Sequence, residues 1–235
     1  MLDRLTLSAL EWWQEAGVDT GVDEQPRDWL AAASSAPTAR SMPIASPVAA
    51  PPAQPALPGT LAAFRQWLLI DPSVPGPVAA RLDASGDSAG AAMMVLDMPE
   101  AGDRAAGRLL SGEAGGLFDN MLKAIGLDRA SAYLAPLTPA RPMSGRLNPA
   151  MLEIFGRLIR HHVALVRPRR LLLLGDASCR AVLGLSCQEA RGRIHQVAIG
   201  SGIPAVASYP PRLLIQTPAS KPAAWADLKL FMGLQ

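Results

Sequence analysis

Length and composition allow one sizeable α/β domain with an appendage, because the chain has 235 residues, of which 49% are hydrophobic. No apolar run approaches the roughly 20 residues that a membrane span requires. Glu11 and Glu15 interrupt the first residues too early for a signal peptide, so we expect a cytoplasmic protein without membrane contact. The two cysteines, Cys179 and Cys187, fit neither a disulfide framework nor a metal knuckle.

The charges are distributed unevenly, although the net charge is only +2. Residues 141–235 carry 13 Lys and Arg against 4 Asp and Glu, and nearly all of these cations are arginines. A basic half of this kind suits contacts with phosphates. Solvated helix faces are an equally good explanation for several of these arginines.

The N-terminal region divides into two parts before the main domain begins. Leu5, Leu10 and Trp13 share one face of a helical pattern, which predicts an N-terminal helical segment within residues 1–31. Residues 32–58 consist mostly of Ala, Pro and Ser and predict a disordered linker. The Trp-bearing helix would suit docking on a protein partner, and the main domain is expected over residues 59–235.

From residue 60 onward, helical patterns alternate with short apolar runs. Helices are expected at residues 60–69, 115–126, 150–166, 177–183 and 221–232, and strands at residues 91–96, 132–134, 169–174 and 203–207. Strands that are apolar throughout are typical of a parallel sheet covered on both faces. The pattern therefore predicts an α/β fold with three αβα layers and a four-stranded, mainly parallel, doubly wound sheet.

The loop after the last of these strands has the sequence Tyr209-Pro210-Pro211-Arg212-Leu213-Leu214. Its two prolines end the strand and give the loop a fixed shape. Ligand sites of open α/β sheets form where loops leave the carboxyl ends of strands, so this loop is a candidate site. His161 and His162 lie in the middle of a predicted helix and are expected on an exposed basic face.

Several short segments follow one another in a distinctive order: GEAGGLFDNML at 112–122, GLDR at 126–129, RP at 141–142, ALVRPR at 164–169, RGRIH at 191–195 and SYPPRLL at 208–214. Together they resemble the uracil-DNA glycosylase superfamily, in particular its bacterial iron–sulfur branch, over about residues 64–231. The resemblance implies this family's α/β fold and DNA as the partner.

The family's functional positions are mostly altered in this chain. The family has G-E-x-P-G after its first strand, with an acid that positions or activates water. That place holds Asp97-Met98-Pro99-Glu100-Ala101 here, so Met98 takes the acid's position and Asp97 and Glu100 flank it. A base-stacking Phe corresponds to Leu110, and a base-reading Asn corresponds to Pro136, which has no side-chain donor or acceptor.

The family's H-P-x-x-L-L loop, whose His stabilises the leaving base, corresponds to the loop at residues 209–214. Tyr209 replaces that His and can still donate a hydrogen bond. The resemblance implies DNA contacts for five residues of this region and its surroundings: Arg212, Leu213, Leu214, Arg141 and Lys221. One of the two leucines would be the wedge that enters the duplex.

Glu113 lies in a segment, Gly112-Glu113-Ala114-Gly115-Gly116, that looks like the acidic motif in isolation. By position the segment opens a helix, so Glu113 is expected as a first-turn acid favoured by the helix dipole. The glycines would allow close approach of a neighbouring backbone.

The iron–sulfur branch binds its cluster through four cysteines. In this chain the corresponding residues are Phe64, Trp67, Ala140 and Phe155. Four thiolates are needed for such a cluster, so we expect no cofactor and no metal. We further expect Phe64, Trp67 and Phe155 to contact one another and fill the vacated volume.

Two functions remain open from the sequence. The chain could be a divergent DNA-repair glycosylase of weak or altered base-excision activity, in which Asp97 or Glu100 activates water and Tyr209 acts as a donor. Alternatively, it could be a non-catalytic DNA- or protein-binding module of a replication or repair assembly. A closed or apolar pocket at Met98, Leu110 and Pro136 would favour the second function, and convergence of Asp97, Glu100 and Tyr209 in an open cleft would favour the first.

Overall fold

The computed structural model describes residues 56–234. The predicted helical segment at residues 1–31, its partner-docking role and most of the predicted linker lie outside the described residues. None of the described helices combines the length and the hydropathy that a membrane span requires.

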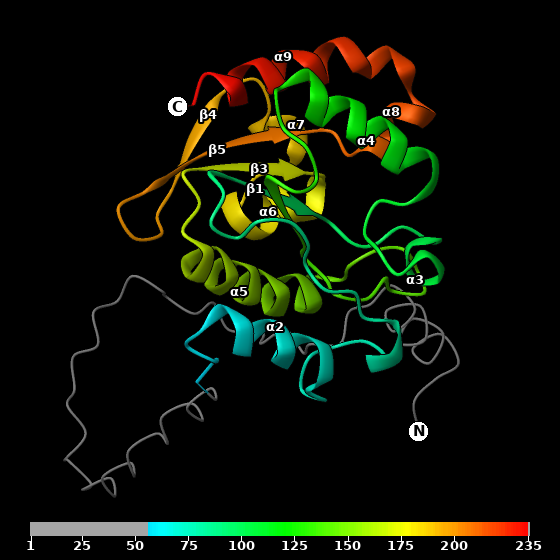
Figure 1. The fold of residues 1–235 in the computed structure, drawn as a ribbon, viewed down its shortest axis with the longest axis vertical. Coiled ribbons are helices and arrows are strands. Elements are labelled where there is room, and N and C mark those ends of the chain that lie inside the picture. Colours follow the sequence, from blue (N-terminus) through cyan, green and yellow to red (C-terminus); the bar gives the residue numbers. More distant parts are fainter. Residues whose placement is uncertain (1–55, 235) are drawn as a thin grey trace, which may run out of the picture. The chain divides into compact units, whose positions relative to one another are not determined.

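The chain from Leu61 to Met232 alternates helices and strands, as the sequence predicts (Figure 1). The helices are α2 (Leu61–Ile70), α3 (Asp103–Ala106), α4 (Gly112–Ala124), α5 (Pro149–Val166), α6 (Asp176–Leu183), α7 (Cys187–Ala190), α8 (Pro211–Gln216) and α9 (Lys221–Met232), with 3₁₀ turns η1 (Val78–Ala80) and η2 (Pro218–Ser220). The strands are β1 (Ala92–Leu96), β2 (Ala132–Pro136), β3 (Arg170–Leu174), β4 (Ile194–Val197) and β5 (Ile203–Ser208).

The sheet has the order β2-β1-β3-β5-β4 and contains five strands, so the predicted number of four is wrong. The four predicted strands are parallel to one another, and β4 is antiparallel to β5 at one edge. The additional strand has the sequence Ile-His-Gln-Val and buries only Val197. A four-residue edge strand of mixed polarity carries too little hydrophobic pattern to be identified from sequence.

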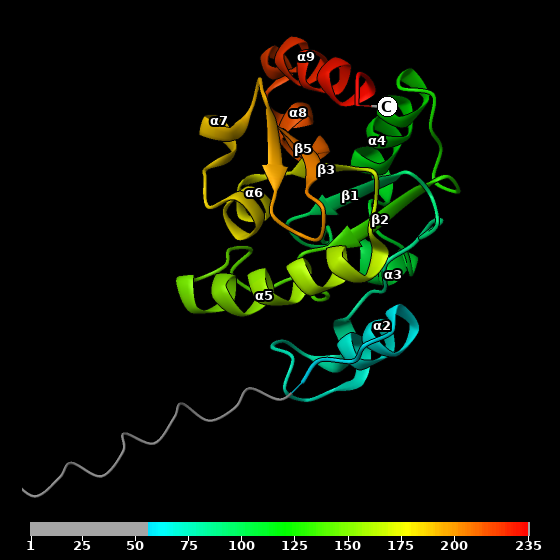
Figure 2. The same ribbon diagram turned by 90° about the vertical axis from the view of Figure 1, so that its left-hand side faces the viewer.

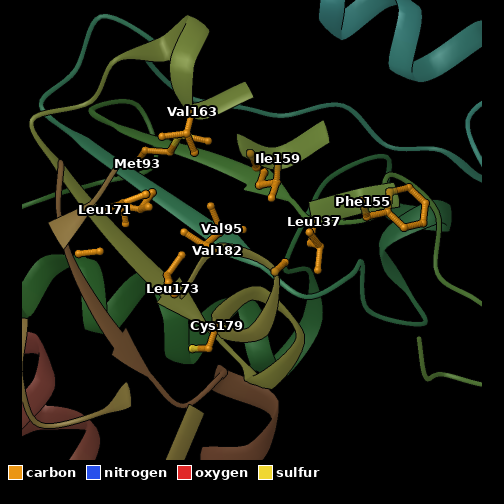
Figure 3. Close-up of a cluster of buried hydrophobic side chains, with 14 of the residues drawn as sticks. Met93, Val95, Leu137, Phe155, Ile159, Val163, Leu171, Leu173, Cys179 and Val182 are labelled. Atoms are coloured by element: carbon orange, nitrogen blue, oxygen red, sulfur yellow. The ribbon is translucent and has the colours of Figure 1, made fainter. Parts of the chain in front are cut away.

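Alternate residues of each parallel strand face two separate hydrophobic cores, which confirms the predicted three layers. Met93, Val95, Leu171 and Leu173 join the core under α5, α6 and α7 (Figure 3). The residues between them face the second core, under α4, α8 and α9. Figures 1 and 2 show α4 and α9 on one side of the sheet and α5 and α6 on the other. Burial of both sheet faces explains why the strands are apolar throughout.

His162 is buried, so its predicted place on an exposed face of α5 is wrong. Its Nε2 atom lies 2.9 Å from the Tyr133 hydroxyl on β2 and shares a hydrogen bond with it. Burial lowers the pKa of His162 to about 4, and burial raises the pKa of Tyr133 to about 12. Both groups are therefore neutral at pH 7 and satisfy each other inside the core.

Protonation of His162 is expected to destabilise the fold in acid. In the unfolded chain a histidine takes up a proton near pH 6.5, whereas in the folded protein the pKa of His162 is about 4. The contribution is therefore complete above pH 6.5 and is lost as the pH falls to about 4, at a cost of about 3 kcal/mol. Urea unfolding across this range should show a shallower pH dependence in His162→Gln than in wild type. His161→Gln is the matched control on the same helix, and equal slopes in all three proteins would contradict the prediction.

Candidate functional site

The carboxyl ends of the four parallel strands form one edge of the sheet. From β1 the chain passes to β2 on one side, and β3 and then β5 follow on the other side. The strand order thus reverses between β1 and β3, and ligands of open α/β sheets bind in the crevice at such a switch point. The residues that follow β1 and β3 are Asp97 and Gly175, so these positions define the candidate site.

Asp97 lies at this switch point and is held by the start of α6. Its Oδ1 atom accepts a hydrogen bond of 2.7 Å from the Ser178 backbone N–H. A β-carbon at Gly175 would lie 2.2 Å from the Asp97 carboxylate, so only glycine allows the carboxylate to sit here. Burial raises the pKa of Asp97, and hydrogen bonds from Ser178 and Ala177 partly oppose this. The sequence could not show the role of Gly175 and Ser178, which lie 78 and more residues away along the chain.

Glu100 connects three loops at the same edge. Its carboxylate lies 3.8 Å from Arg141 Nη1, in the loop after β2, and 3.5 Å from Arg212 Nε, on α8. Arg141 Nη1 also donates a 3.0 Å hydrogen bond to the Pro99 carbonyl. Burial raises the pKa of Glu100, and the two arginines partly oppose it. Two predicted DNA contacts, Arg141 and Arg212, therefore converge on the second predicted acid.

The loop between β1 and α4 is organised by Asp103, which is fully buried. Its carboxylate accepts backbone hydrogen bonds from Glu100, Leu110 and Ser111, all between 2.7 and 2.8 Å. This network fixes the backbone on both sides of α3. Asp103 could not be recognised from the sequence, because the acid that begins a four-residue helix gives no sign of such bonds to the backbone on either side.

Leu110 points into the core and does not line an open cleft. It is 2% exposed, and its backbone has a positive φ of 49°. Its carbonyl accepts a 2.6 Å hydrogen bond from Arg129 Nη2, and a β-carbon at Gly115 would lie 2.0 Å from that oxygen. Gly115 thus permits the expected close backbone approach, and Glu113 is an exposed first-turn acid of α4, which confirms that prediction.

The other two altered positions do not form a base pocket either. Pro136 is the last residue of β2, is buried, and pairs with Leu96 of β1. Met98 is half-buried beside Asp97. The apolar, closed surroundings of Leu110 and Pro136 match the arrangement expected for the non-catalytic alternative.

Tyr209 follows β5 directly and is half-buried under a guanidinium group. The Arg191 Cζ atom lies 3.8 Å from the centre of the Tyr209 ring, a cation–π contact. Arg191 Nε in turn donates a 2.6 Å hydrogen bond to Asp227 Oδ2 of α9, which is 1% exposed. Arg191 and Asp227 position Tyr209 and were missed as site residues, although Arg191 lies in a segment that carried the family resemblance.

The predicted loop after Tyr209 is a short helix, so its description as a loop is wrong. Pro210 caps α8, and Pro211 occupies its first turn, where a missing N–H has no cost. Leu214 is 2% exposed and belongs to the second core, whereas Leu213 is half-buried. Of the two predicted wedge residues, Leu213 is the one that this conformation leaves accessible. Arg212 and Lys221 are exposed, on α8 and at the start of α9.

The positions that correspond to cluster cysteines carry no metal-ligating side chain. Phe64, Ala140 and Phe155 are buried, and Trp67 packs against the same core, so the residues present do not fit an iron–sulfur cluster. The rings of Phe64 and Trp67 stack with centroids 5.9 Å apart, as expected. Phe64 also meets the rings of His161 and His162. Phe155 belongs to the same core, and direct contact of its ring with Phe64 or Trp67 stays a prediction.

Comparison with known proteins agrees with the fold. The curated relative Type-4 uracil-DNA glycosylase from Pyrobaculum aerophilum is 27% identical over 149 residues, which cover 60% of this chain and 76% of the relative. The family model described as the uracil DNA glycosylase superfamily matches residues 91–229, from the start of β1 into α9. Since this match covers more than half of the sequence, the chain belongs to the uracil DNA glycosylase superfamily.

Proposed function

We propose that the protein is a DNA-repair glycosylase that hydrolyses an N-glycosidic bond in DNA with weak or altered base specificity. The observation that carries this proposal is the position of Asp97, a carboxylate directly after β1, at the switch point between β1 and β3, that the start of α6 holds in place. Similarity to the Type-4 uracil-DNA glycosylase of Pyrobaculum aerophilum supports uracil as the first base to test.

A shifted alignment of the acidic motif supports the role of Asp97. In G-E-x-P-G the acid and the proline are separated by one residue, and Asp97 and Pro99 have this spacing. With this alignment Asp97 replaces the family's glutamate, and Met98 takes the variable position. Without this shift of one residue, Met98 would stand at the position of the acid.

The reaction needs one water and two charge-stabilising groups. Water adds its oxygen to the anomeric carbon as the carbon–nitrogen bond breaks, and the electron pair of that bond leaves with the base. The Asp97 carboxylate would accept the water proton and oppose the positive charge that develops on the sugar. The base would leave as an anion that accepts a hydrogen bond from the Tyr209 hydroxyl, and Arg191 would hold the Tyr209 ring in place.

The altered positions argue for reduced or redirected specificity. Leu110 and Pro136 supply neither a stacking ring nor an amide that reads a base edge, and both are buried. A site without these groups loses the hydrogen bonds that distinguish one base from another. The same two residues favour the second candidate function, a DNA- or protein-binding module without catalysis.

A base-release assay with the full chain separates the two functions. Single- and double-stranded DNA carrying uracil, hypoxanthine or another deaminated base should release free base with the wild-type protein. Tyr209→Phe, which keeps the ring under Arg191 and removes the hydroxyl, should lower the rate by about 10²-fold or more. DNA binding without release of any base by wild type would reject the enzyme and leave the binding module. Unchanged release by Tyr209→Phe would remove Tyr209 from the mechanism.

A further inference from the structure

An apolar groove lies between α4 and α9, outside the candidate catalytic crevice. Its volume is about 200 Å³, and its walls include Leu117 and Met121 of α4 and Trp225 of α9. Trp225 is 41% exposed, so a large part of its side chain is open to solvent. The groove therefore presents an aromatic ring and an apolar surface that the described residues leave uncovered.

The polar groups of the groove are few and suit a nucleotide. Lys221 is the only charged residue among the described residues that line it, and Asn120 contributes an amide from the facing helix. Both are exposed. No hydrogen bond or ion pair within the described chain occupies the Lys221 ammonium. An aromatic ring with a nearby lysine is the combination that binds unpaired nucleotides, because the base stacks on the ring and the cation pairs with the phosphate.

The groove adjoins α8, which carries part of the proposed DNA-binding surface. Leu214 of α8 forms part of the groove wall, and its neighbours in the sequence, Arg212 and Leu213, are the exposed cation and the accessible wedge. Helix α8 therefore contributes residues both to the groove and to the proposed DNA-binding surface. The small volume admits a single flat ring more readily than a folded partner.

We propose that the groove between α4 and α9 binds one unpaired nucleotide of the DNA strand next to the site of base removal, with the base stacked on Trp225 and its phosphate paired with Lys221. The proposal rests on the proposed function insofar as it assumes that α8 contacts DNA. The groove would add a preference for DNA with unpaired nucleotides near the lesion. The candidate catalytic site alone does not supply this preference.

Binding to lesion-free DNA tests the groove separately from catalysis. The full chain is titrated with a fluorescein-labelled duplex that ends in an unpaired thymine tail, and with the same duplex without the tail. Trp225→Leu, which stays apolar and loses the aromatic ring, should weaken binding to the tailed duplex about tenfold. Binding to the blunt duplex should change less than about twofold, and Trp225→Phe should retain most of the affinity for the tail.

Lys221→Ala supplies a second, independent measurement. It should reduce the slope of log affinity against log salt for the tailed duplex by about 1, as expected for one lost phosphate contact. Ile70→Ala is the matched control, because Ile70 is also an exposed apolar residue but lies on α2, and it should change the affinity for neither duplex. Thermal unfolding of each variant shows that the fold is retained.

The outcomes distinguish this proposal from the proposed function. Loss of the tail preference in Trp225→Leu supports the groove even if no base is released by the wild-type protein. Equal affinity of wild type and Trp225→Leu for the tailed duplex overturns the proposal. An equal loss of affinity for the tailed and the blunt duplex in Trp225→Leu also overturns the proposal. Tight binding of an apolar peptide by wild type and Trp225→Leu alike would assign the groove to a protein partner instead.

Discussion

Replacing Asp97 by asparagine should lower the rate of base release by about 10²- to 10⁴-fold, the usual contribution of a positioned general acid or base. Asparagine keeps the shape and an oxygen that can accept the Ser178 N–H bond, but it cannot take a proton from water. Single-turnover release of base from DNA measures the chemical step directly. The matched control is Glu100→Gln in the same loop, which frees Arg141 and Arg212 from a negatively charged partner and should strengthen DNA binding while changing the chemical step much less than Asp97→Asn does.

The pH profile gives this prediction a second readout. Burial raises the pKa of Asp97 above the ordinary value of about 3.9 for an aspartate. The carboxylate is the active form, so the rate should rise with pH through this raised pKa and level off above it. Glu100→Gln should retain this acidic limb. A profile without the limb, or an Asp97→Asn variant as fast as wild type, would exclude Asp97 as the base.

Replacing Phe64 by alanine should destabilise the fold by roughly 3–5 kcal/mol, which is typical for truncation of a buried aromatic side chain. Phe64 is 0% exposed and contacts Trp67, His161 and His162 through its ring. The change would open a cavity where α2 meets α5 and would remove the Phe64 ring from both histidines, leaving His162 with Tyr133 alone as its aromatic neighbour. Urea unfolding monitored by circular dichroism measures the loss.

The control for Phe64 lies on the same helix. Ile70→Ala removes a hydrophobic side chain that is 61% exposed and should cost less than about 1 kcal/mol. A loss of less than about 1 kcal/mol in the free energy of unfolding of Phe64→Ala would show that this ring does not take over the structural role of the iron–sulfur cluster. Phe64→Leu should fall between the two, because it keeps part of the buried volume.

The layers of the fold could be predicted from the sequence, because strands that are buried on both faces of the sheet are apolar throughout. Four runs of apolar residues predicted the parallel strands, and the helices between them predicted the two covering layers. The signal failed for β4, which buries only Val197. It also failed for His162, since a polar residue on α5 gives no sign that Tyr133 lies opposite it in the core.

The candidate site could be located from the sequence but not assembled. The strand ends and the family resemblance pointed to Asp97, Glu100 and Tyr209. The partners that fix these side chains come from distant segments: Ser178 for Asp97, Arg212 for Glu100 and Arg191 for Tyr209. Only folding brings such pairs together, and no local pattern encodes them.

The position of Glu100 between Arg141 and Arg212 also affects the thermodynamics of docking on DNA. These arginines already have a fixed counterion, the Glu100 carboxylate, within 4 Å. A DNA phosphate that pairs with either arginine displaces the Glu100 carboxylate from the guanidinium, and it releases no dissolved ion. Each such pairing also leaves Glu100 with one fewer positively charged partner. The affinity for DNA gained at this edge is therefore smaller than two free arginines would provide. DNA binding also weakens the ion pairs that connect the loop after β1 with the loop after β2 and with α8.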